Sequence, residues 1–515
     1  MKRQFLLFAV PFLLAGFLHA QEGFGFGTPE ESGASPASLP SAVKIGGSAQ
    51  VKLLGYPDDF RSASKLKNTP LADIFTGKLN FNAAGSFSEA VINLKLSPAP
   101  FFDDFTAADF IDESYVRAFF GRFDIEGGYR KLTWGKADSF GPLDVVNPMD
   151  YRDPTDMMDV RGRKIARPMV HASYRFGAFT RLEGVFIPWF EGHKFVLDPA
   201  KRWAPSQLME RPAAIAESIV AGFPAGLQPA AAGEVADFLD QGGIEGAYPD
   251  TKTLIALKYA QAGLRLTSTI GSSDIGFQYF YGNLFRPAIR MNGVEAFVEA
   301  SKAAAMAGIA AAQAAGTPLA AQAAAQALVA QRAADAAKAN VRPEVAYNRY
   351  HQIGVDYAQV IAGFNIRSEF GVNITDDLSG DDGAVYNPAL VWSLGFDRDL
   401  IAGINVNLQV NESVRLLDNK VGDSVALDTE AGTDMTSTRL TLILSRKFFR
   451  DELELKATGL WGIEDRDFLI LPAAIWTKGD LEMEVSGGVF GGDRKGELGQ
   501  YRRNGFVKTA LTYKF

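Results

Sequence analysis

The feature that most constrains the fold is a strict alternation of apolar and polar residues that recurs along the chain. The segment FNIRSEFGVNIT (residues 364–375) places Phe, Ile and Val on one face and Asn, Arg and Glu on the other. INVNLQVN (404–411), DELELKATGLW (451–461) and LEMEVSG (481–487) repeat the pattern. Such alternation predicts β-strands with one apolar and one polar face. The apolar face must then meet another sheet or lipid, and the polar face must meet water.

Eighteen segments of this kind follow one another, so we expect an all-β chain that forms an antiparallel transmembrane β-barrel. An even number returns the last strand to the side of the membrane from which the first one starts. Sixteen strands are the alternative if one hairpin is misread. The expected strands are 42–55, 72–85, 88–97, 112–122, 124–134, 166–176, 179–189, 253–270, 275–287, 347–360, 363–375, 387–399, 403–415, 436–448, 452–463, 467–477, 480–490 and 502–515.

Three features favour a membrane barrel over a soluble periplasmic β protein, which is the alternative. The final segment VKTALTYKF places Val507, Leu511, Tyr513 and Phe515 on one face, and a last strand that ends in Phe resembles the assembly signal of bacterial outer-membrane proteins. Short turns such as residues 271–274 and 401–403 alternate with long polar loops, as in outer-membrane barrels. The third feature is the N-terminus.

The N-terminus has the layout of a secretory signal peptide. Lys2 and Arg3 precede an apolar run over residues 5–18, and Ala20 offers a small residue for cleavage. An uncleaved anchor is the alternative, although the run is short for a bilayer span. We therefore expect a signal peptide over residues 1–20, a linker over 21–40 and an outer-membrane barrel over 41–515.

Composition excludes several other classes. The chain has no Cys and four His, which removes disulfide scaffolds, Cys-ligated zinc and thiol nucleophiles. Its net charge of -8 gives no basic surface of the nucleic-acid-binding type. The Gly-Asp-Ser at 422–424 lacks a downstream Asp-x-x-His, so we read it as a chance match to an esterase motif. We expect no enzyme activity, no catalytic or metal-binding residues, no cofactor and no nucleic-acid partner.

Two long insertions interrupt the strands on what should be the external side. The first, 191–250, contains a helical piece around residues 208–221 followed by Pro- and Ala-rich sequence. The second, 291–346, predicts two Ala-rich helices broken at Gly316-Thr317-Pro318. Either the helices cap or plug the pore, or they form an external hairpin that covers only the rim.

One loop carries an unusual density of charge. The segment Trp134 to Pro168, called the charged loop below, has acids followed by bases and three internal prolines that stiffen its backbone. A stiff loop with both signs of charge, folded into the lumen, would form a constriction that selects by charge and size. The alternative is a solvated external loop tied by weak surface ion pairs. The constriction candidates are Asp138, Asp144, Asp150, Arg152, Asp153, Asp156, Asp159, Arg161, Arg163 and Lys164.

The same loop carries a resemblance. W-G-x-x-D followed by P-L-D-V-V-N-P-x-D is similar to a motif of a widespread, poorly characterised family of porin-like Gram-negative outer-membrane proteins, and the likeness is best over residues 129–168. The segment 261–283 is similar in style to the barrel hairpins of that family. The resemblance implies an outer-membrane β-barrel and transport, without a known substrate. The Ala-rich insertion departs from the simple porin pattern.

The leading hypothesis is a porin-like channel in the cell outer membrane for passive or facilitated diffusion of small solutes. Its lumen candidates are Arg367, Glu369, Asn407 and Lys456, which lie on polar strand faces. The alternatives are a gated transporter of hydrophobic compounds and a closed surface barrel that acts as an adhesin or structural protein. The expected partners are the lipid bilayer, the outer-membrane assembly machinery and a small solute, and a homo-oligomer is left open.

Overall fold

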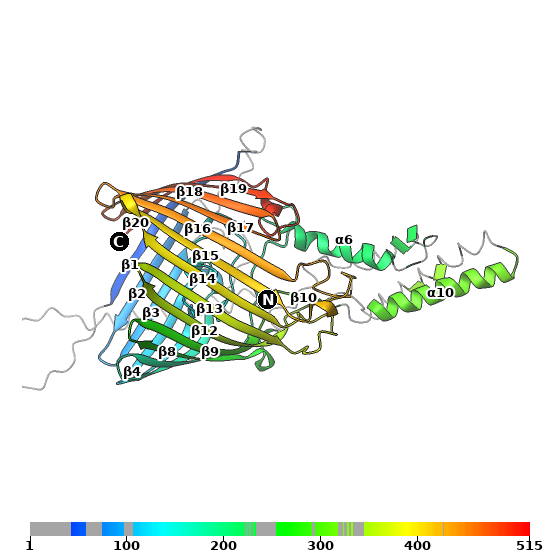
Figure 1. The fold of residues 1–515 in the computed structure, drawn as a ribbon, viewed down its shortest axis with the longest axis horizontal. Coiled ribbons are helices and arrows are strands. Elements are labelled where there is room, and N and C mark those ends of the chain that lie inside the picture. Colours follow the sequence, from blue (N-terminus) through cyan, green and yellow to red (C-terminus); the bar gives the residue numbers. More distant parts are fainter. Residues whose placement is uncertain are drawn as a thin grey trace, which may run out of the picture. The chain divides into compact units, whose positions relative to one another are not determined.

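Eighteen strands form one closed antiparallel barrel in a computed structural model of the chain (Figure 1). The structure describes residues 43–57, 75–96, 107–221, 254–290, 294–317, 344–425 and 427–515, with isolated positions within 223–232 and 323–332. The expected signal peptide (1–20) and linker (21–40) lie outside these residues. Most of the first insertion beyond residue 221 and most of the second of the two expected Ala-rich helices also lie outside them.

Each barrel strand pairs with its neighbours along the chain, and β1 closes the ring by pairing with both β2 and β20. The final carboxyl-terminal residue takes part in the seam, because Phe515 exchanges two backbone hydrogen bonds with Gly47. The barrel strands are β1 (Lys44–Gly55), β2 (Phe75–Ala84), β3 (Ser88–Leu96), β4 (Ile111–Phe120), β5 (Phe123–Arg130), β6 (Arg167–Phe176), β7 (Thr180–Ile187), β8 (Gln261–Ile270), β9 (Ser273–Asn283), β12 (Arg349–Ile361), β13 (Phe364–Thr375), β14 (Ala389–Asp399), β15 (Ile404–Arg415), β16 (Thr436–Phe448), β17 (Leu453–Gly462), β18 (Asp467–Lys478), β19 (Leu481–Gly492) and β20 (Phe506–Lys514).

The alternating sequence pattern gives the barrel its two faces. Along β13, Phe370 on the outward face is 46% exposed, whereas its neighbour Glu369 on the inward face is 2% exposed. Val116, Leu264 and Ile353 stand on outward faces of other strands and are exposed in the same way. An apolar outer surface of this extent suits lipid, and a polar inner surface suits a wet lumen.

Connections alternate between short and long around most of the barrel, as expected, and the four-residue turn 463–466 between β17 and β18 is an exception. Short turns such as 121–122, 271–272 and 479–480 lie at one end of the barrel, called the short-turn side, together with the C-terminus. The charged loop, the described parts of both insertions and the loops 376–388 and 416–435 lie at the other end, called the long-loop side. The sequence therefore predicted the eighteen strands correctly, and the long connections share one end of the barrel as the strand count requires.

Most strand boundaries lie within four residues of the expectation, and one differs by eight. The sequence predicted a strand from residue 253, but β8 begins at Gln261, after the 3₁₀ turn Leu257–Tyr259. The backbone carbonyl of Leu254 instead accepts a hydrogen bond from the amide of Phe190, which lies between β7 and the first insertion. The residues before β8 therefore contact the segment next to the first insertion and take no part in the strand pairing of the barrel.

Helices occur at the long-loop side. Helix α6 (Ser206–Ala221) forms where the sequence predicted one, and Arg211 ties it to the 416–435 loop by donating to the carbonyls of Val425, Asp428 and Thr429. Helix α10 (Val294–Ala314) lies between the two strands of a small ribbon, β10 (Ala288–Arg290) and β11 (Glu344–Ala346), and Figure 1 shows it pointing away from the barrel end. None of the helices in the described part of the chain combines the length and apolar character needed to cross a bilayer.

Candidate pore constriction

The charged loop turns into the barrel from the end of β5. Its first half contacts inward-facing residues of β9, β12, β13 and β15. Asp138 accepts hydrogen bonds from Arg367 of β13 (2.6 Å) and from Asn407 of β15 (2.8 Å). Gln409 of β15 accepts from the backbone amides of Asp138 and Ser139. The structure therefore brings three predicted residues, Asp138, Arg367 and Asn407, into one cluster.

Apolar contacts fix the same half of the loop. Leu143 is fully buried, and its side chain lies against Gly354 of β12 and Gly371 of β13. A methyl group added at Gly354 would lie 2.5 Å from Leu143 Cδ2, and one added at Gly371 would lie 2.8 Å from the same atom. The barrel wall therefore has no side chain at these two positions, because the side chain of Leu143 occupies the space. Trp134 packs edge-on against Phe280 of β9 in a cluster that includes Met169 and Val185.

The second half of the loop reaches the opposite wall. Asp153 and Asp156 contact Lys52 of β1 at 3.0 and 3.4 Å, and Asp156 also pairs with Lys508 of β20. In ring order β12 is the tenth strand, nine steps from β1 in either direction. The charged loop therefore holds diametrically opposed walls and crosses the lumen.

The basic residues of the loop pair with partners on several elements. Arg161 contacts Glu113 of β4 at 2.7 Å, although its side chain stays 63% exposed. Lys164 is buried and pairs with Asp144 at 2.6 Å. Arg163 is also buried, stacks over the ring of Tyr151 and donates to the carbonyl of Met157. Most of the predicted charges thus lie beside a charge of opposite sign. Among Arg161, Arg163 and Lys164, Arg161 is the most exposed to solvent.

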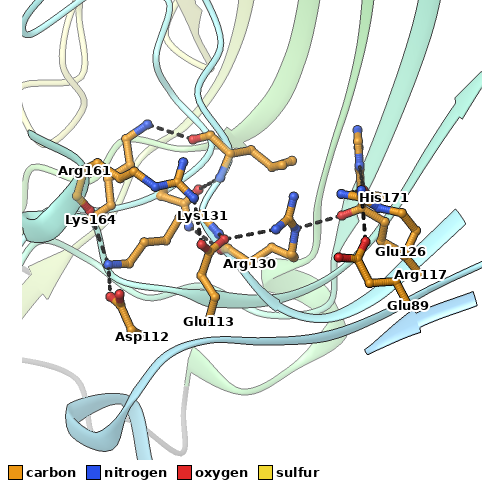
Figure 2. A network of polar contacts seen from close by, with 12 residues as sticks. Glu89, Asp112, Glu113, Arg117, Glu126, Arg130, Lys131, Arg161, Lys164 and His171 are labelled. Carbon is orange, nitrogen blue, oxygen red and sulfur yellow. Dashed lines mark hydrogen bonds and ion pairs between the residues drawn. The ribbon is translucent and has the colours of Figure 1, made fainter. Parts of the chain in front are cut away.

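A chain of alternating charges runs along the inner wall from Arg161 (Figure 2). Glu113 links Arg161 to Arg130 of β5, Arg130 contacts Glu126, and Glu126 pairs with Arg117 of β4 at 2.6 Å. Opposite charges placed on adjacent strands stabilise the pairing of those strands. Because neighbours in the chain carry opposite signs, the wall is polar without a large net charge at this point.

The first insertion completes the narrowed region. Lys194 of the insertion exchanges backbone hydrogen bonds with the charged loop: its amide donates to the Met149 carbonyl (3.0 Å), and its carbonyl accepts from the Tyr151 amide (2.8 Å). Phe195 stacks on Tyr151 with a ring distance of 5.4 Å. Further along, Trp203 packs inside the barrel against Phe490, Phe506 and Met157 of the loop. Two segments, and not the charged loop alone, therefore form the structure that crosses the lumen.

The remaining predicted residues have more local roles. Asp150 forms a two-point contact with Arg152, at 2.9 and 2.7 Å. Asp159 caps the short helix α5 (Val160–Arg163) by accepting from the Gly162 amide. Lys456 faces inward from β17 beside Ser445 and Ala473 and has no ion-pair partner among the described residues.

Burial and pairing set the ionisation of the loop acids. Burial raises the pKa of the Asp144 carboxyl, even though the ammonium of Lys164 opposes that rise. Burial would also raise the pKa of Asp150, but the guanidinium of Arg152 more than offsets it, and the pKa lies below its ordinary value. The two carboxyls therefore differ in how firmly they hold their charge.

Several residues of this region were not found from the sequence. Lys52, Lys508 and Gln409 anchor the loop from strands distant in the chain, and Glu113 anchors it from the strand before β5. Strand alternation marks these residues only as inward-facing. Glycines at inward positions, such as Gly354 and Gly371, are the one signal that could have indicated a close approach of another segment.

No protein-family model matches the chain, and no curated protein matches its sequence. Solved structures do resemble it. They include a BenF-like porin from Pseudomonas fluorescens Pf-5 (8% identity, TM-score 0.42, covering 92% of this chain and 98% of that one) and Wzi from Escherichia coli, described as an outer-membrane carbohydrate-binding β-barrel (8%, 0.41, 92% and 84%). The outer-membrane channel DcaP of Acinetobacter baumannii is a third (9%, 0.36, 92% and 98%). At these identities and scores the likenesses add nothing to what strand pairing already establishes.

Proposed function

We propose that the protein is a porin-like channel in the outer membrane that lets small solutes diffuse through its lumen, with the charged loop as its constriction. The observation that carries this proposal is the loop anchored at once to β12–β13 and to the β1–β20 seam. A segment that crosses a closed, polar-lined barrel narrows the aqueous path without changing the barrel wall.

The inner wall supports polar solutes. Inward positions carry charged and amide side chains, among them Arg117, Glu126, Gln278 and Gln352. The constriction presents the exposed base Arg161, whereas most of its acids contact lysines or arginines. A solute that passes here would exchange its hydration for contacts with mixed charge, so we propose discrimination by size with a modest charge preference.

The test is single-channel conductance of the refolded protein in planar bilayers, together with the reversal potential in a salt gradient. We expect stable conductance steps. Arg161→Glu should shift the reversal potential toward cation preference, because a carboxylate would replace the exposed guanidinium at the constriction. Arg450→Glu is the matched control, since Arg450 is exposed in the 449–452 turn on the short-turn side, and it should leave the reversal potential nearly unchanged.

Absence of conductance from protein shown to be folded by heat-modifiable gel mobility would refute the channel. It would instead favour a closed surface barrel or a transporter of hydrophobic compounds. Equal shifts from both arginine variants would refute the assignment of the charged loop as the constriction while leaving the channel itself in place.

A further inference from the structure

The carboxylate of Glu369 occupies a pocket made by the backbone of the charged loop. Glu369 faces inward from β13 and is almost fully buried. Its Oε1 accepts hydrogen bonds from the amides of Lys136 (2.5 Å) and Ala137 (2.6 Å), and its Oε2 accepts from the amide of Leu143 (3.0 Å). Successive backbone N–H groups that converge on one point form an anion-binding concavity. Here the anion belongs to the barrel wall.

The loop is shaped closely around this carboxylate. Gly135 has a φ of +87°, which side chains other than glycine rarely adopt, and a Cβ there would lie 2.2 Å from Glu369 Oε1. A Cβ at Gly141 would lie 2.9 Å from Oε2. The two glycines thus flank the donating amides of Lys136 and Ala137, and neither position can accept a side chain while Glu369 is in place.

The carboxylate is chemically specific at this point. All three groups that face it are donors, and a carboxylate is an acceptor at both oxygens. The amide of a glutamine would turn one NH₂ group toward a backbone N–H, which leaves at least one buried donor without a partner. Hydrogen bonds to an ionised acceptor are also the stronger kind.

We propose that Glu369 is the positioning residue of the constriction, a built-in carboxylate ligand that fixes the pose of the charged loop and hence the width of the pore. The width part of this inference rests on the proposed channel function, whereas the positioning part does not. The neighbouring contact of Asp138 with Arg367 and Asn407 lies on the more exposed side of the same loop segment and involves no backbone pocket.

The experiment is chemical rescue of Glu369→Ala. This change removes Cγ and the carboxyl group, which are the atoms that acetate would replace. We expect the variant to expose the loop to protease about tenfold faster or more, from the loss of charge-assisted hydrogen bonds. Sodium acetate should restore protection, and acetamide or sodium chloride at matched concentration should not. In bilayers the same variant should show larger, noisier conductance that acetate returns toward the wild-type value.

Asp138→Asn is the matched control, because it removes a carboxylate from the same segment and leaves the backbone pocket filled. Acetate should not change its protease sensitivity. If Glu369→Ala fails to fold, Glu369→Gln takes its place, with faster cleavage expected from the mismatched amide. Unchanged protease protection in the folded Glu369 variants, or a loss that acetate does not restore in Glu369→Ala, would overturn the inference. Silent bilayers with acetate-dependent protection would overturn the channel and leave the positioning role standing.

Discussion

Acid should release the first insertion from the charged loop, because His193 must stay neutral where the two segments meet. His193 Nδ1 accepts a hydrogen bond from the Met149 amide at 2.9 Å, which requires that nitrogen to be unprotonated. The rings of Tyr151, Phe195 and Phe285 surround the imidazole at centroid distances of 5.0, 6.2 and 5.2 Å. Burial, reinforced by the nearby Arg163 charge, lowers the pKa of His193 to about 3.

The size of the effect follows from the two pKa values. An undocked His193 has an ordinary pKa of about 6.5. Between pH 6.5 and about 3 the undocked state binds the extra proton, so the docked state loses stability as the pH falls through this window. Above pH 6.5 both states are neutral and His193 has no effect. At pH 5 the loss is at most about 2 kcal/mol, or roughly 30-fold in the docking equilibrium.

Hydrogen exchange measures this directly at the amides of Met149, Tyr151 and Lys194, which join the two segments. Exchange rates, corrected for their intrinsic pH dependence, should show up to about 30-fold less protection at pH 5 than at pH 7. His193→Gln is the control, since its side-chain oxygen can accept from Met149 and does not titrate. In this variant the protection of the same amides should change much less between pH 7 and pH 5. An identical pH profile in wild type and variant would refute the reasoning, because His171 and the carboxyls titrate in both.

Three further outcomes follow from the packing of the loop and the placement of the insertions. Leu143→Ala should destabilise loop docking by about 2–5 kcal/mol, measured by protease protection, whereas Leu378→Ala at a 70% exposed loop position should have little effect. Gly371→Ala should displace Leu143 and increase current noise, because the new Cβ would lie 2.8 Å from Leu143 Cδ2; unchanged noise would count against the close contact. Deleting residues 291–346 and rejoining the chain with a short linker should leave conductance unchanged, since α10 points away from the barrel end; a higher conductance would indicate a plug.

Strand number and sidedness were accessible from the sequence because the physics that sets them is local. A strand between lipid and water must alternate, as Ile404, Val406 and Leu408 do against Asn405 and Asn407 in β15. The charged loop also stood out locally, through its acids, bases and prolines. Its position inside the barrel agrees with the interpretation made from those residues, although their role in conduction stays a prediction.

The partners of the loop were not accessible, because they depend on contacts between distant segments. Asp156 meets Lys508 across 352 residues, and nothing near either residue indicates the other. The same holds for Glu369, which alternation identifies as inward-facing, while its three backbone donors come from a loop more than 200 residues earlier in the sequence. Single-residue patterns report which face a side chain occupies and carry no information on what fills the space opposite.

The contact of the charged loop with the β1–β20 seam also bears on the order in which the protein assembles. The loop is synthesised after β5, but Lys508 becomes available beside Lys52 only when the final strand has paired with the first. Contacts of such sequence separation form late, after the chain entropy of closure has been overcome. A barrel whose ends have not yet joined therefore offers the loop tip only Lys52, and the complete set of tip contacts requires a closed ring. The contact of Asp156 with Lys508 therefore reports closure of the ring, whereas the contacts of the first half of the loop with β9, β12, β13 and β15 do not involve the seam.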